Sequence, residues 1–332
     1  MSESLTSPHP ADDLTEVPAH APQAPPAAYT PAPAPTTTDY HHVLYREGIR
    51  RWRGFVAIAA LLVAYLGINL GLSFAAIMAD VALGNTTMAA VQAGSTQVTP
   101  LVLLSVNLTA VALIPLSILL QRWLFGVRAG FMSSIRGLFR WRVLGKAAVI
   151  VVPLWLVYVG ISLIVGAPGQ PTSYVLNVSL PLLLVVLLTT WAQSAGEEYG
   201  FRGLITRSVG SWFANTRTAF IVATVVANLL FMVAHLASDP WLIAYYFVFG
   251  VSLSVVTWRT GGLESSVLVH AANNVLLFIP VALFMGGELN MDRSAGVGGP
   301  FMLLPMGMMV LVAVLLSWLA RRKQLAAVGS DL

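Results

Sequence analysis

Apolar residues gather in long, uninterrupted runs along the chain, and charged residues fall mainly between these runs. A run of about 20 apolar residues is long enough to cross a bilayer as a helix. Because membrane-spanning strands need alternating rather than continuous hydrophobicity, the pattern predicts an all-α, polytopic membrane helix bundle. Eight membrane helices are predicted, at about residues 54–79, 100–121, 147–166, 179–206, 217–236, 241–258, 263–285 and 301–320.

The beginning of the chain lacks this pattern. Residues 1–45 are rich in proline and alanine and contain no apolar run. A segment of this composition cannot bury enough apolar surface to offset the entropy lost on ordering, so we expect a disordered cytoplasmic tail there. The transmembrane domain is predicted over residues 46–325.

The composition agrees with a membrane protein. Hydrophobic residues make up 57% of the chain, charged residues make up 10%, and the mean hydropathy is +0.78. A typical soluble domain has about 25% charged residues. The sequence contains no cysteine, which excludes disulfides, thiolate metal ligands and cysteine nucleophiles.

The net charge of +4 does not indicate nucleic-acid binding, because the basic residues lie in short connections beside apolar runs. If the N-terminus is cytoplasmic, every Lys and Arg except Arg293 falls in a cytoplasmic segment. This asymmetry predicts an integral, multi-pass protein of the cell membrane with eight spans and both termini in the cytoplasm. The basic and aromatic connection 122–146 is predicted to lie along the cytoplasmic headgroups.

Two adjacent carboxylates occur in the fourth predicted helix, in the sequence WAQSAGEEYGFRG at residues 191–203. A charged side chain at the bilayer centre costs about 2.5–3.5 kcal/mol on insertion scales, so we look for a partner or a function. Glu198 and Arg202 have the four-residue spacing of a helical ion pair. Glu197 points about 100° away and is predicted to face a different neighbour. Glu264, by contrast, is predicted to begin a helix near the interface, where an acid suits the helix dipole.

Two later helices carry further polar groups. The sequence FMVAH places Phe231 and His235 on one helical face, and HAANN does the same for His270 and Asn274. Small residues near all these groups let helices approach closely and leave space for a substrate: Ala195, Gly196, Gly200, Gly203, Ala234, Ala271 and Ala272.

The depth of His235 in the membrane does not match that of the other polar groups. A straight helix would carry it about 27 Å from Arg217, one or two turns too far. We therefore expect a tilt, a break near Gly203 or Gly210, or an interfacial stretch at 204–213.

These polar groups are sufficient for hydrolysis. A carboxylate and an imidazole can hold and deprotonate a water, while a second imidazole and a carboxamide can donate hydrogen bonds to an oxyanion. The same atoms allow an alternative, a Zn²⁺ ion held by Glu197, His235 and His270. A proton-coupled transporter also uses buried acids and histidines, but it usually shows repeated halves, and this sequence has no internal repeat. A non-catalytic membrane scaffold or immunity factor is the third possibility.

At these three segments the sequence resembles the CAAX protease and bacteriocin-processing family of intramembrane proteases, also called the CPBP or Abi family. This family includes the type II CAAX prenyl endopeptidases. Its motifs, EExxxR, FxxxH and HxxxN, lie in this order on successive membrane helices. The resemblance covers about residues 180–285, and the matching residues are Glu197, Glu198, Arg202, Phe231, His235, His270 and Asn274.

The resemblance implies a role for each of these residues. Glu197 would be the general base, and His235 would help to position the water. His270 and Asn274 would form the oxyanion site. The supporting residues would be Glu198 and Arg202, which hold the helix, and Phe231, which packs beside the site.

The resemblance also implies a substrate class and a metal requirement to be tested. The substrate would be a membrane-anchored or prenylated-like peptide or protein, and the other partner would be membrane lipid rather than nucleic acid. Members of the family have been called metalloproteases, but a glutamate-dependent mechanism without metal has been favoured for the prenyl endopeptidase branch. We expect no required cofactor, because Asn274 is a poor zinc ligand.

Overall fold

The computed structural model describes residues 39–93, 98–165, 175–286, 292–323 and 325. Within these residues the chain is helical and contains no β-strand. Eight helical segments are long and apolar enough to cross a membrane, which confirms the predicted all-α polytopic bundle. They are Trp52–Leu83, Pro100–Phe125, Trp141–Ile164, Leu180–Gly210, Thr216–Ala234, Pro240–Thr260, Glu264–Phe284 and Pro300–Arg322.

Several of these spans consist of more than one element. The second span joins α3 (Pro100–Leu120) to the π-helix η2 (Gln121–Phe125), and the last joins η6 (Pro300–Met302) to α11 (Leu303–Arg322). The fourth span runs without a break through α5 (Leu180–Val185), η4 (Val186–Thr190), α6 (Trp191–Glu198), η5 (Tyr199–Ile205) and α7 (Thr206–Gly210). The remaining elements are η1 (Tyr40–His42), α1 (Trp52–Leu83), α2 (Met88–Gln92), η3 (Ala129–Met132), α4 (Trp141–Val165), α8 (Thr216–Ala234), α9 (Pro240–Thr260) and α10 (Glu264–Phe284).

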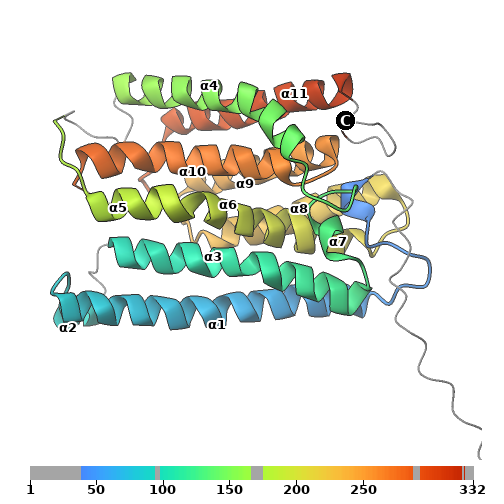
Figure 1. Ribbon diagram of the computed structural model, residues 1–332, viewed down its shortest axis with the longest axis horizontal. Helices are drawn as coiled ribbons and strands as arrows, with labels where there is room; N and C mark the ends of the chain where they lie inside the picture. Colours follow the sequence, from blue (N-terminus) through green and yellow to red (C-terminus); the bar gives the residue numbers. More distant parts are fainter. Residues whose placement is uncertain (1–38, 94–97, 166–174, 287–291, 324, 326–332) are drawn as a thin grey trace, which may run out of the picture. The chain divides into compact units, whose positions relative to one another are not determined.

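The fourth span occupies the middle of the helix packing. Figure 1 shows α3 beside α1 and, on its other side, the α5–α6 region, which is followed by α10. Helix α4 packs on α10, and α11 packs on α9. The acidic motif therefore lies on a helix with neighbours on both sides, which explains how charged groups are kept away from lipid.

This central span departs twice from α-helical geometry. Its elements are α5 (Leu180–Val185), η4 (Val186–Thr190), α6 (Trp191–Glu198), η5 (Tyr199–Ile205) and α7 (Thr206–Gly210), and both η segments are π-helical. π-Helical turns are rare and occur frequently at functional sites. The second one begins directly after the carboxylate pair and includes Gly203, one of the two glycines where a distortion was expected. Residues 204–210 are helical and buried within the protein.

Gly196 fixes the contact between α6 and α3. A Cβ atom at this position would lie 1.9 Å from the carbonyl oxygen of Ala110, a distance that no side chain could occupy. The two backbones can touch only because residue 196 has no side chain. Glu197, the next residue, is therefore held at a fixed distance from α3.

The folded region begins before residue 46. Of the segment predicted as a tail, residues 39–45 are described, and Tyr40, Val43 and Leu44 are buried in the core. The Tyr40 hydroxyl donates to the carbonyl of Met132, and the His41 and His42 rings contact backbone carbonyls at 3.0 and 2.9 Å. Residues 1–38 lie outside the described residues.

The connection 122–146 was predicted to lie along the cytoplasmic headgroups. In the structure, part of it is packed into the helix bundle. Trp123 and Trp141 are exposed, but Met132 and Arg140 are buried. Arg140 forms an ion pair with Glu264, at 2.7 Å, at the start of α10. This pair was not predicted because the two residues are far apart in sequence. A buried acid at the start of a helix needs a cation, and here the cation comes from another segment.

Candidate active site

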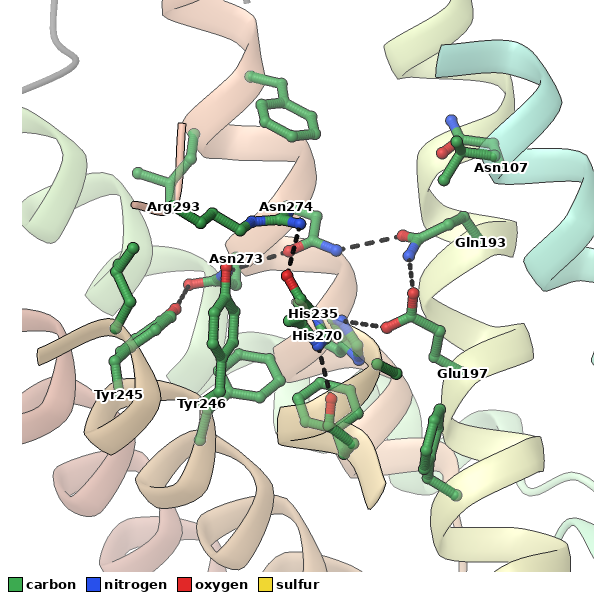
Figure 2. A pocket seen from close by; sticks show the side chains of 18 of the residues that line it. Asn107, Gln193, Glu197, His235, Tyr245, Tyr246, His270, Asn273, Asn274 and Arg293 are labelled. Carbon is green, nitrogen blue, oxygen red and sulfur yellow. Dashed lines mark hydrogen bonds and ion pairs between the residues drawn. The ribbon is translucent and has the colours of Figure 1, made fainter. Parts of the chain in front are cut away.

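A cavity of about 390 Å³ lies among α1, α3, α6, α8, α9 and α10. Glu197, His235, His270 and Asn274 all line it, so the structure brings the four predicted groups to one place (Figure 2). Its volume falls within the usual range for ligand sites. Apolar and aromatic side chains form most of the remaining wall, among them Tyr65, Leu103, Phe201, Phe231, Tyr245, Tyr246, Phe249, Leu277 and Phe278.

His270 lies between the two carboxylates of the acidic motif. Its Nδ1 is 2.8 Å from Oε1 of Glu198, and its Nε2 is 3.5 Å from Oε2 of Glu197. A carboxylate oxygen accepts, so Nδ1 donates and carries the ring proton. In the neutral ring Nε2 is then an acceptor that faces a second acceptor, and a proton or a water is needed between them.

The predicted ion pair of Glu198 and Arg202 is present, with 2.9 Å between Oε1 and Nη1. Both side chains are fully buried. The guanidinium also donates to Asn228 Oδ1 at 3.3 Å and lies 4.4 Å from the centre of the Phe231 ring. The contact of Glu198 with His270 was not predicted, because helical spacing reveals neighbours within one helix and not across two.

Only one of the two carboxylate oxygens of Glu197 accepts a hydrogen bond from a described residue. Gln193 Nε2 donates to its Oε1 at 2.5 Å, whereas Oε2 is buried and has no hydrogen-bond partner among the described residues. Gln193 Oε1 in turn accepts from Asn274 Nδ2 at 3.1 Å (Figure 2). Gln193 therefore links the carboxylate on α6 to the amide on α10. Sequence analysis missed it, although its spacing of four residues from Glu197 was a usable signal.

His235 caps the C-terminal end of α8. Its Nδ1 donates to the carbonyl of Phe231 at 2.8 Å, and its ring centre lies 4.0 Å from that of Tyr246. Burial lowers the pKa of His235 to about 3, so the ring is neutral near pH 7. Because Nδ1 carries the proton, Nε2 is an acceptor.

Arg293 is a second residue that sequence analysis did not place in the site. It follows α10, lines the cavity and donates from Nη1 to the backbone carbonyl of His235 at 2.9 Å. Its signal was its position, because it is the basic residue that the charge count leaves outside the cytoplasmic segments. Tyr245 and Asn273 were also missed, and they are joined by a hydrogen bond of 3.3 Å.

The suggested zinc ligands Glu197, His235 and His270 all lie in the described part of the chain. No group of three His, Asp or Glu side chains there has an arrangement that could hold a metal ion. Of the suggested ligands, His270 uses Nδ1 for the Glu198 carboxylate. His235 uses Nδ1 for a backbone carbonyl.

Comparison with known proteins agrees with the motifs. A family model described as "Type II CAAX prenyl endopeptidase Rce1-like" matches residues 179–276, the segment that contains all three motifs. The resemblance to this family is therefore confirmed for that segment, and the eight apolar helices agree with an integral, multi-pass membrane protein.

The chain is also similar to the uncharacterized protein YyaK of Bacillus subtilis (strain 168). The two are 31% identical over 102 residues, which cover 29% of this chain and 33% of the relative. The match thus spans about a third of the relative's length. No solved structure matches this chain.

Proposed function

We propose that this protein is an intramembrane endopeptidase that hydrolyses a peptide bond of a membrane-associated substrate. The observation that carries the proposal is the open Oε2 of Glu197, which faces Nε2 of His270 at 3.5 Å inside the cavity. A general base needs an unpaired acceptor beside the proton that it removes. The match of residues 179–276 to type II CAAX prenyl endopeptidases supports the same activity.

We propose that Glu197 and His270 hold a water between them. A water that donates one hydrogen to Oε2 of Glu197 and the other to Nε2 of His270 turns its lone pairs towards the cavity. When the water oxygen attacks the carbonyl carbon, Glu197 takes its proton and the carbonyl oxygen becomes an oxyanion. The C–N bond then breaks, and Glu197 returns the proton to the leaving nitrogen.

We propose for His270 a role different from the one that the resemblance implies. Its Nδ1–H is engaged by Glu198, so a neutral His270 has no hydrogen left to donate to an oxyanion. We assign the oxyanion contacts to the Arg293 guanidinium, which lines the cavity, and to the Asn274 amide, whose Nδ2 would have to release the Ser194 hydroxyl, its partner at 3.3 Å. We propose that His235, with Nε2 as an acceptor, binds the water or a substrate N–H.

The cavity walls favour an apolar substrate segment. Aromatic side chains surround the polar groups. A membrane-anchored or prenylated-like peptide would fit this chemistry, whereas nucleic acid would not. We propose that no metal is required, because Glu197 and His270 can activate water themselves. A chelator should then leave turnover unchanged in purified protein.

The experiment that tests the function compares peptide termini in cells that carry the wild-type protein or Glu197→Gln. We expect the termini produced by the wild type to disappear, since loss of a general base lowers the rate by about 10²–10⁴-fold. Glu47→Gln, at an exposed site outside the cavity, is the matched control. Unchanged termini at equal protein level would favour a scaffold. A transporter would be favoured if Glu197→Gln abolished proton-coupled uptake of a solute by the same cells.

A further inference from the structure

The cavity occupies one half of the helix bundle. Helix α9 contributes residues only from its first half, α3 only from its first turns, and α8 only from its last turns. Helix α10 contributes from its second turn onwards, towards its C-terminal end. The cavity therefore lies towards the end where α3 and α9 begin and where α8 and α10 end.

Connections from different parts of the chain meet at this end. The amide of Asn177 donates to the carbonyl of Leu283 at 2.9 Å, which joins the start of α5 to the end of α10. The amide of Ser238 donates to the carbonyl of Arg293 at 2.9 Å, which joins the α8–α9 turn to the segment after α10. Asp292, which is exposed, also lines the cavity. The cavity thus reaches the surface beside this segment.

The opposite end of the bundle is closed below the carboxylates. The Glu198–Arg202 pair and the Phe231 ring form the floor, and all three side chains are buried. Further along, Tyr40 and Arg207 are also fully buried. A second cavity, beside Tyr40 and Arg202, measures about 10 Å³, which is barely enough for one water. A peptide cannot reach Glu197 from this end without unpacking the core.

The basic residues identify the two ends. Among the 18 Lys and Arg residues, Arg293 alone belongs to a connection at the cavity end. The other Lys and Arg residues lie at the opposite end of the bundle, either in the helix ends or in the connections between them. Lys and Arg within about 15–20 residues of a span favour the cytoplasmic side. The end that carries the cavity is then the extracytoplasmic one.

We propose that the cavity opens to the extracytoplasmic face, so that the substrate is a peptide segment exported to, or anchored on, that side of the membrane. That the bound peptide is a substrate rests on the proposed function. The orientation of the bundle and the side from which the cavity is reached do not depend on catalysis. It separates exported peptides from lipidated tails exposed in the cytoplasm, which would meet the closed end.

The absence of cysteine from the sequence makes the test direct. Single cysteines are introduced by Leu277→Cys and Ala234→Cys in the cavity wall, by Ser294→Cys at the exposed mouth, and by Glu47→Cys at the exposed basic end. A small, charged, membrane-impermeant methanethiosulfonate is applied to intact cells and to inside-out vesicles. We expect it to label the cavity and mouth cysteines in intact cells, and the Glu47→Cys cysteine only in inside-out vesicles.

Three results would overturn the inference. The first is that the cavity cysteines react only in inside-out vesicles. The second is that the mouth cysteine reacts only in inside-out vesicles. The third is that the mouth cysteine reacts in intact cells but neither cavity cysteine does. If Leu277→Cys does not fold, Ala234→Cys decides, because its side chain grows by one atom. Labelling needs no turnover, so the result stands even if Glu197→Gln leaves peptide termini unchanged.

Discussion

The two buried acid–base pairs of this protein, Arg140–Glu264 and Arg202–Glu198, differ in how completely their atoms are used. Arg140 meets both oxygens of Glu264 in a two-pronged contact, at 2.9 and 2.7 Å, and also donates to the carbonyls of Thr260 and Leu325. Arg202 meets one oxygen of Glu198, and its Nε has no hydrogen-bond partner among the described residues.

The difference separates structural from functional charge. The first pair joins three distant segments and leaves the acid fully engaged. In the second pair the same oxygen of Glu198 accepts from both Arg202 and His270. That oxygen therefore fixes the tautomer of an imidazole that faces the cavity, as outer partners do for catalytic histidines. A buried charge that is only partly paired is the one to examine for function.

The largest effect is expected from breaking the first pair. Arg140→Met leaves the Glu264 carboxylate buried without a cation, which typically costs about 3–5 kcal/mol. Thermal unfolding in detergent should show a large loss of stability or no folded protein. The control is Arg142→Met, which makes the same substitution at an exposed position two residues away. Adding Glu264→Met to Arg140→Met should recover much of the loss, and no recovery would contradict a pairwise origin.

A smaller loss of stability is expected from Glu198→Gln, because the carboxamide oxygen can still accept from Arg202, and the loss of activity should be larger. The substitution keeps the shape of the side chain but removes the charge that holds the Nδ1–H of His270. We expect turnover to fall by about 10–100-fold, the range known for lost partners that orient metal-bound histidines. Measuring turnover and unfolding temperature together tests this, and a loss of stability as large as that of Arg140→Met would mean that both pairs are structural.

The smallest effect, opposite in sign, is expected for the stability of Glu197→Gln. The carboxamide can donate directly to Nε2 of His270, whereas the carboxylate oxygen and Nε2 are both acceptors and have to share a water. Satisfying a buried polar atom is worth about 1 kcal/mol, so the unfolding temperature should rise while activity is lost. A fall in unfolding temperature would indicate that Glu197 holds the bundle together rather than serving the reaction.

The features predicted from sequence are those determined by local periodicity. The eight spans follow from apolar runs, and the Glu198–Arg202 pair follows from a spacing of four residues. The contacts that were missed, Glu198 with His270 and Arg140 with Glu264, join residues more than 70 positions apart. Such pairs depend on which helices pack together, and a single sequence contains no direct measure of that.

The position of Arg293 shows the same limit from another side. The charge count identified it as exceptional, but only the packing of the segment after α10 against the α8–α9 turn places it in the cavity. Likewise, the proline-rich composition of the first residues concealed the buried Tyr40 and Leu44. Average composition describes a segment, whereas burial is decided for each residue.

The missing side chain at Gly196 has a consequence for the energetics of the reaction. Because the backbone of α6 rests directly on that of α3, the neighbouring carboxylate is preorganised and loses little freedom when a transition state forms. Part of the entropic cost of catalysis has then already been met when the helices pack during folding.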